Sequence, residues 1–190
     1  MNKTYIEDQT FENLDFSENE LPKANYENCT FINCTFAQTN LSDISFIDCS
    51  FTDCNLSMAK LTKTTLNNIQ FKNCKLLGIQ FEHCNKFLFS VNFENCILNL
   101  SSFYQLDLKK QVFKNCSLQE ADFTNCNLSS SVFDNCNLEK ATFENTILDK
   151  ANLQTAYHYT IDPELNSLKK AKFSLIGVVG LLGKYDIIVE

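Results

Sequence analysis

The feature that most constrains this chain is a large apolar residue at every fifth position over most of its length. The series runs without a break from Phe11 to Phe81 and, after a slip of two residues, from Leu88 to Leu153. We call these 29 positions repeat centres; all are Phe, Leu or Tyr, although only 46 of the 190 residues are. A period of five fits neither an α-helix nor a flat strand, since either would turn many centres towards water. The chain must therefore turn a corner at each repeat.

Four five-residue sides close a square coil. Coils stacked at the strand spacing of about 4.8 Å place each centre over the centre four repeats earlier. In the second half of the chain Phe and Leu alternate as centres, so like residues stack on like. Asn recurs two positions after the centre, which fits a corner because Asn tolerates turn conformations. The predicted core columns include Phe93, Phe103, Phe113, Phe123, Phe133 and Phe143.

All ten cysteines share one phase, two positions before a centre, with Cys84 in that phase just before the slip. This predicts a second, narrower inward column of reduced thiols, which includes Cys96, Cys116 and Cys136, because buried free Cys packs as a small apolar residue. Reduced thiols favour the cytoplasm. The sequence lacks Cys-x-x-Cys, and inward thiols are poor nucleophiles. We therefore expect no metal, no cofactor and no catalysis.

Segments such as Ala121-Asp122-Phe123-Thr124-Asn125 and Ala151-Asn152-Leu153-Gln154-Thr155 resemble the repeat of the pentapeptide-repeat proteins, which centres on Leu or Phe. The resemblance covers residues 9–155. It implies an all-β solenoid, a right-handed quadrilateral β-helix of about seven coils with a short C-terminal helical and strand tail. The predicted organisation is a lead-in at 1–8, repeats at 9–155 with a slip in register at 82–87, and a capping or dimerisation tail at 156–190.

At the slip, the residue expected as a centre is Lys86, which could not be buried without a partner. The chain is therefore expected to bulge there, with Phe87 and Phe89 facing solvent on either side of Leu88. Two interpretations remain open. These rings either cover the backbone of the bulge or, with the outward Leu77 and Tyr104, form a contact site for a partner.

From Ala156 the five-residue period is lost. Asp162-Pro163-Glu164 predicts a helix start, Ser174 a cap for a second helix through Leu182, and Ile187–Val189 a strand. The tail is more apolar than a lid requires, and it resembles the end of the Qnr-type quinolone-protection branch, which implies a homodimer through this segment. The predicted dimer interface comprises Leu175, Ile176, Val178, Val179, Leu182, Tyr185, Ile187 and Val189.

The charge balance restricts the partners. The chain carries 23 acidic residues and 16 basic ones, for a net charge of −7, and every basic residue is Lys. Without Arg or a basic face, direct binding of nucleic acid is not expected. No segment reaches the roughly 20 apolar residues that cross a membrane. The repeats at 9–155 contain 17 acidic residues and 11 Lys, net −6, in an even and weak distribution.

Resemblance to the Qnr and MfpA-type branch implies a rod that binds DNA gyrase or topoisomerase IV by imitating duplex DNA, sometimes with protection from quinolones. The long projecting loops frequent in that branch are absent here, since the one interruption is two residues long. The alternative is a structural or scaffolding protein with an unrelated cytoplasmic partner. Neither interpretation makes this chain an enzyme.

Overall fold

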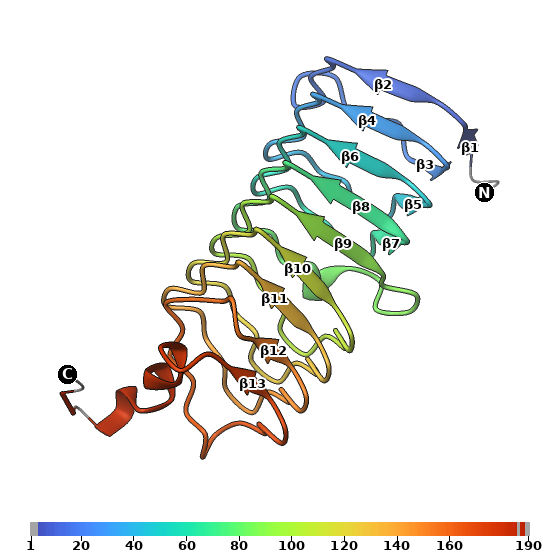
Figure 1. Ribbon diagram of the computed structural model, residues 1–190. Coiled ribbons are helices and arrows are strands. Elements are labelled where there is room, and N and C mark those ends of the chain that lie inside the picture. Colours follow the sequence, from blue (N-terminus) through green and yellow to red (C-terminus); the bar gives the residue numbers. More distant parts are fainter. Residues whose placement is uncertain (1–3, 186, 189–190) are drawn as a thin grey trace. The chain divides into compact units, whose positions relative to one another are not determined.

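The structure is a computed structural model that describes residues 4–185 and 187–188. The chain is an all-β solenoid of parallel strands with little helix (Figure 1). It consists of two compact units, which join at Leu98 and Asn99 and are described separately. The solenoid makes about eight turns, and the last of them lies beyond the repeat boundary expected at residue 155.

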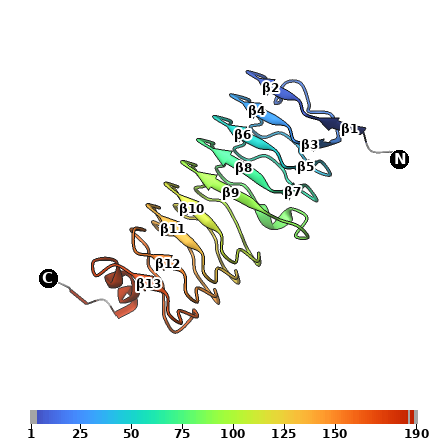
Figure 2. The ribbon, with the colours of Figure 1, turned by 45° about the vertical axis from the view of Figure 1, so that its right-hand side comes forward.

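Unit 1 contains strands from two parallel sheets, and each strand pairs with the equivalent strand of the next coil (Figures 1 and 2). The four-stranded sheet comprises β1 (Thr4–Glu7), β3 (Ala24–Glu27), β5 (Ser45–Ile47) and β7 (Thr65–Asn67). The second sheet contributes β2 (Thr10–Glu12), β4 (Thr30–Ile32), β6 (Ser50–Thr52), β8 (Ile69–Lys72) and β9 (Val91–Glu94). The lead-in expected at 1–8 therefore includes a paired strand.

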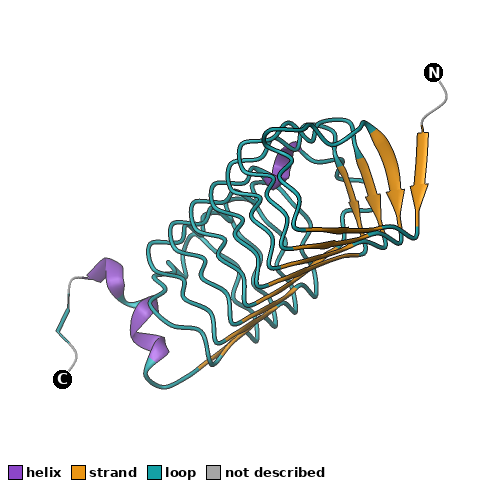
Figure 3. Cartoon of the chain, turned by 90° about the horizontal axis from the view of Figure 1, so that it is seen from above, coloured by secondary structure: helices purple, strands orange, loops and turns teal. Residues whose placement is uncertain are grey.

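In unit 2 the strands are short and follow the same register. They are β10 (Val112–Lys114), β11 (Val132–Asp134), β12 (Asn152–Leu153) and β13 (Lys172–Phe173). Phe113 pairs with Phe133, and Leu153 pairs with Phe173, so each step from coil to coil covers four repeats. Helical structure is limited to three 3₁₀ turns among the described residues, drawn in purple in Figure 3: η1 (Phe81–His83), η2 (Gly177–Leu181) and η3 (Gly183–Tyr185).

The core consists of the repeat centres, 27 of which are buried. Rings four repeats apart stack face to face. In unit 1 the Phe31 and Phe51 centroids are 4.7 Å apart with planes 8° from parallel. In unit 2 the Phe103 and Phe123 centroids are 5.1 Å apart with planes at 4°. The remaining predicted core residues, Phe93, Phe113, Phe133, Phe143, Cys96, Cys116 and Cys136, are also buried.

All ten cysteines are buried and free. The structure adds a reason for a polar small residue in this column. The Cys49 thiol donates to the carbonyl oxygen of the centre Tyr26, in the coil before it, at 3.4 Å. Thr64, in the same phase, donates to Leu41 at 2.8 Å. The small column therefore satisfies carbonyl groups of the preceding coil, as buried polar groups require.

The corners lie two positions after the centres, where the backbone adopts a left-handed conformation. Of the 27 described non-glycine residues with positive φ, 14 are Asn or Asp, the types that tolerate this conformation best. Their side chains also join successive coils. The Asn33 amide donates to Asn13 at 2.7 Å, and the Asn135 amide donates to Asn115 at 2.9 Å. The corner role predicted for Asn is confirmed.

At the slip, the prediction that Leu88 is a buried repeat centre is wrong. Leu88 is 57% exposed and has a φ of 65°, which places it at the corner that Asn68 occupies one coil earlier. The two extra residues follow that corner, before Val91 resumes pairing with Ile69. Phe89 does not face solvent fully; it is half-buried, and its ring meets Phe81 edge to face at 6.1 Å.

The tail also differs from expectation. The segment after Asp162 forms a turn instead of a helix, and Ile187 and Ile188 are not in a strand; Val189 lies outside the described residues. The Ser174 hydroxyl oxygen accepts from the Gly177 amide at 2.9 Å, but the helix that follows is the short η2, whose N-cap residue is Ile176. Strand pairing meanwhile continues to β13.

Candidate interaction surfaces

The inner columns offer no reactive group to a substrate. The thiols are buried, and burial raises the pKa of Cys49 and of Cys84 to about 12, so both are protonated at neutral pH and poor nucleophiles. Among residues 4–185 and 187–188, no three His, Cys, Asp or Glu side chains gather as they would to hold a metal ion.

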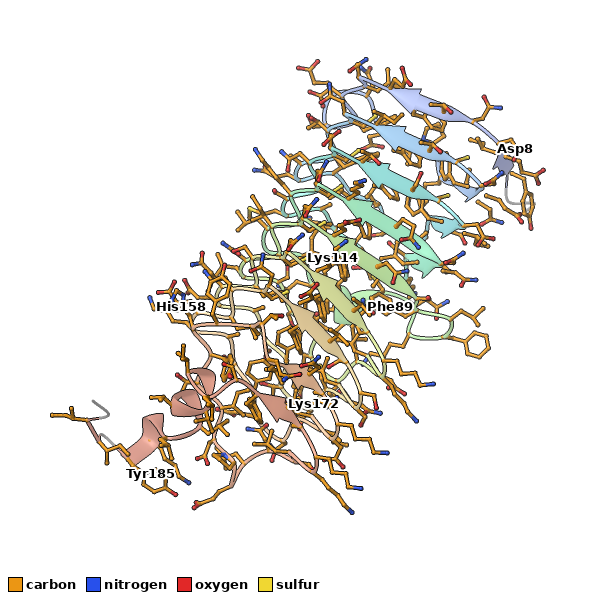
Figure 4. The ribbon with its side chains drawn as sticks, in the orientation of Figure 1. Asp8, Phe89, Lys114, His158, Lys172 and Tyr185 are labelled. Carbon is orange, nitrogen blue, oxygen red and sulfur yellow. The ribbon has the colours of Figure 1, made fainter. Side chains whose placement is uncertain are left out.

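The loop at the slip presents one exposed ring. Phe87 is 76% exposed, whereas Phe89 packs on Phe81 (Figure 4 labels Phe89). Of the other predicted contact residues, Leu77 is half-buried and Tyr104 is 37% exposed. Leu77 follows the centre Leu76 on a different side of the coil from β7, so the structure does not bring it together with the loop.

Unit 1 has one strongly acidic face, the four-stranded sheet. The outward positions of its strands and of the corners that follow them carry carboxylates and no lysine. The corners before the strands differ, since Lys63 lies before β7 and Lys23 lies before β3. These carboxylates are Glu7, Asp8, Glu27 and Asp48. Two of them hold corner amides: Asn28 donates to Asp8 at 2.5 Å, and Asn68 donates to Asp48 at 2.6 Å.

Unit 2 separates its charges between two sides. The residues that flank the stacked rings of Phe103, Phe123 and Phe143 include Asp122 and Glu144 and no lysine. A neighbouring corner carries lysines in three of four coils, Lys110, Lys150 and Lys170, all with positive φ. Within each unit the charges are therefore less evenly distributed than in the repeat region as a whole. Charges counted separately by side and by half of the chain would have revealed this.

The tail lies at the end of unit 2 and exposes most of the predicted interface. The exposed fractions reach 93% for Leu175 and 89% for Ile176, while Val178, Val179, Tyr185 and Ile187 are exposed to a lesser extent and Leu182 is half-buried. Beneath the tail, a cavity of about 470 Å³ is lined by residues that include Tyr157, His158 and Ile176.

One cation holds the tail to the last coil. The Lys184 ammonium lies 3.0 Å from an Asp162 oxygen and 2.7 Å from a Glu164 oxygen. The pKa of Asp162 is lowered, first by the hydrogen bond from the Glu164 amide and then by the one from Lys184. The pKa of Lys184 is raised, mainly by its hydrogen bond to Glu164. The glycines of η2 allow close contact, since a Cβ at Gly180 would overlap the Tyr159 carbonyl oxygen.

Within the described residues there is no helix with the length and apolar character that a membrane crossing needs.

Comparison with known proteins gives the following matches. The structure of full-length QnrB1, described as a plasmid-mediated fluoroquinolone resistance protein, is 19% identical, with 96% of this chain and 100% of that chain covered and a TM-score of 0.46. The structure of a trypsin-treated QnrB1 variant is 20% identical, with 98% of this chain and 99% of that chain covered and a TM-score of 0.48. A third match is HetL from the cyanobacterium Nostoc sp. strain PCC 7120, described as a pentapeptide-repeat protein involved in heterocyst differentiation regulation. It is 15% identical, with 91% of this chain and 87% of that chain covered and a TM-score of 0.34.

A search of the curated proteins found no match. A family model described as a pentapeptide repeat region matches residues 24–87 and 86–157, which is more than half of the chain. These matched segments contain all ten cysteines and most of the buried centres and corners described above. The chain belongs to the pentapeptide-repeat family.

Proposed function

We propose that this chain is a non-enzymatic binding protein whose partner is a type II topoisomerase, DNA gyrase or topoisomerase IV, engaged by partial imitation of duplex DNA. The observation that carries this proposal is the acidic face within each unit: Glu7, Asp8, Glu27 and Asp48 in one, Asp122 and Glu144 in the other. The sequence resemblance to the Qnr and MfpA-type branch, set out above, supplies the identity of the partner.

The density of carboxylates on the acidic faces determines how strongly the protein should compete with DNA. Duplex DNA carries one charge per roughly 1.7 Å of axis, whereas stacked coils advance about 4.8 Å each. On the acidic faces about one carboxylate per coil points outward, so the imitation is incomplete. Competition with DNA for a lysine- and arginine-lined groove should therefore require micromolar protein and weaken with salt.

The test is a gyrase supercoiling assay with purified protein. We expect loss of supercoiling at micromolar concentrations. Glu144→Lys should raise the concentration for half-inhibition several-fold, because it reverses a charge on the acidic side of unit 2. Glu120→Lys is the matched control, since this residue is also exposed but lies beside the centre Leu118 on another side. No inhibition up to tens of micromolar, with no change in quinolone sensitivity, would retire the topoisomerase proposal.

We also propose that the protein forms a homodimer through the tail. The support is the exposed apolar side chains of Leu175 and Ile176, which a monomer leaves in water at a cost. Light scattering coupled to size exclusion at micromolar protein should give twice the chain mass of 21.8 kDa. Leu175→Glu should give the monomer; a monomeric wild type would refute the proposal.

The alternative is a structural or scaffolding protein with an unrelated partner, and the observation that favours it is the exposed Phe87. The two rings of the loop now have separable roles. Phe87→Ser should leave thermal stability unchanged and remove partner binding, whereas Phe89→Ser should lower stability because Phe89 packs on Phe81. A stability loss with Phe87→Ser equal to that with Phe89→Ser would remove the basis for this alternative.

A further inference from the structure

Within the described residues, the first coil of unit 1 has a strand edge with no partner strand on its outer side. β1 (Thr4–Glu7) is the outermost strand of the four-stranded sheet and pairs only with β3 on its inner side among the described residues (Figure 3). An edge strand presents a row of N–H and C=O groups to whatever approaches it, which makes it a template for one more strand.

Side chains around this edge are incompletely covered. Ile6 and Phe11 are half-buried, whereas the residues one coil later in the same columns, Tyr26 and Phe31, are 0% exposed. On the outward side of β1, Tyr5 is 64% exposed. An added strand with an apolar residue over Ile6 would continue this column, as each following coil does.

The charge around the edge selects the occupant. Between Lys3 and Lys23 the chain carries six carboxylates and no other Lys, Arg or His. A hollow of about 290 Å³ opens at the end of β1, lined by Glu7, Asp8, Glu27 and Asn28 (Figure 4 labels Asp8). A second copy of this coil would bring six further carboxylates to the edge and be repelled. A lysine or arginine side chain is the complementary group.

We propose that the free edge of β1 binds an extended, cationic segment of a partner protein as an additional strand, with a Lys or Arg side chain in the hollow of Glu7, Asp8 and Glu27. Residues that alternate with the cationic ones would be apolar and would cover Ile6. The sheet edge supplies main-chain hydrogen bonds, and the carboxylates supply selectivity for charge. This inference goes beyond the proposed function, because it does not require a topoisomerase.

The test uses fluorescence anisotropy with the full chain and a labelled peptide of alternating Lys and Leu. We expect saturable binding that weakens at least tenfold between 50 and 300 mM salt. Two further peptides have the same charge but carry N-methyl groups on one edge or on the other. Methylation of the edge that faces β1 should abolish binding, and methylation of the opposite edge should not. Equal binding of both methylated peptides would overturn the proposal, since it would show charge attraction without strand pairing.

Protein variants locate the site. Glu7→Gln combined with Glu27→Gln should weaken the peptide at least fivefold, because it removes two carboxylates from the hollow. The matched control is Glu120→Gln combined with Glu144→Gln in unit 2, which should leave the affinity unchanged. All of these residues are exposed, and thermal melts check that each variant folds. An equal loss in the control pair would contradict the assignment. The supercoiling assay does not involve the peptide, so failure of either proposal leaves the other testable.

Discussion

The first and last coils solve the problem of a solenoid end differently. The first coil keeps the five-residue pattern, at Ile6, Phe11 and Phe16, but leaves β1 as an open and acidic edge. In the last coil, Leu153 to Phe173, that pattern is broken, yet it is covered by the tail. An end coil can therefore have repeat centres and still be incompletely buried, or lack some of them and still be covered.

The last coil teaches that the backbone ladder, and not the run of centres, maintains the step from coil to coil. Leu148 donates its amide to the Ser167 carbonyl at 2.7 Å, and Lys172 donates to Ala151 at 2.8 Å. The side-chain role of the thiol column persists as well. The Asn166 amide donates to the Phe143 carbonyl oxygen of the preceding coil at 2.8 Å, as thiols do in other coils. Tyr159 and Ile161 are also buried in this coil.

The largest effect should come from core truncation away from both end coils. Phe113→Ala is expected to cost about 3–5 kcal/mol, the usual range for a fully buried Phe. Phe11→Ala in the first coil should cost well under half as much, because Phe11 is only half-buried. Urea denaturation of both variants measures the difference. Equal losses would mean that the first coil is as well covered as the interior.

A smaller effect should follow from disturbing the cover of the last coil. Gly180→Ala places a Cβ on the Tyr159 carbonyl oxygen, so η2 must shift, at about 1–3 kcal/mol as for other overpacked sites. Amide hydrogen exchange should show faster exchange at Ile161, which donates to the Gly180 carbonyl. Gly78→Ala is not a suitable control because Gly78 has a φ of 68°; Ala171→Gly, away from η2, is the better one. Unchanged exchange at Ile161 would show that the tail does not cover the coil.

The sequence pattern predicts burial well where side-chain identity and backbone position agree. The phenylalanine columns and the thiol column follow from spacing alone. Leu88 shows the failure: its side chain is typical of a centre, but its backbone occupies a corner, and a side-chain count cannot distinguish the two positions. Strand pairing beyond residue 155 was not predicted either. Leu168 and Phe173 lie three and four repeats after Leu153, a signal that a search for unbroken fives overlooks.

The surfaces were harder to predict, because charge averaged over the repeat region hides its distribution within each unit. The six carboxylates of the first coil and the lysines at the corners of Lys150 and Lys170 become visible only when each coil side is considered by itself. The turn after Asp162 was predicted as a helix because Asp-Pro-Glu is a common helix start. In the structure the Asp162 side chain instead accepts from the Glu164 amide and from Lys184.

The smallest effect should be the pH dependence of the tail. The lowered pKa of Asp162 means that its contribution is present above the ordinary value of 3.8 and is lost as the pH falls below it. The raised pKa of Lys184 means that its contribution is present below 10.5 and is lost above that value. Exchange of the η2 and η3 amides should therefore be pH-independent between these limits, after correction for intrinsic rates, and faster outside them. Lys184→Met should remove the Lys184-dependent change at high pH; an unchanged profile would show that this ion pair does not hold the tail.

The most direct test of the backbone ladder as the determinant of the solenoid is hydrogen exchange of the Lys172 amide. It donates to Ala151 in the last coil, after the two positions at which the five-residue pattern is broken, His158 and Pro163. We predict protection comparable to that of the Val132 amide, which donates to Gln111 within the regular repeats. Exchange of Lys172 as fast as that of the exposed Ile187 would contradict the account, since the solenoid would then end with its repeats.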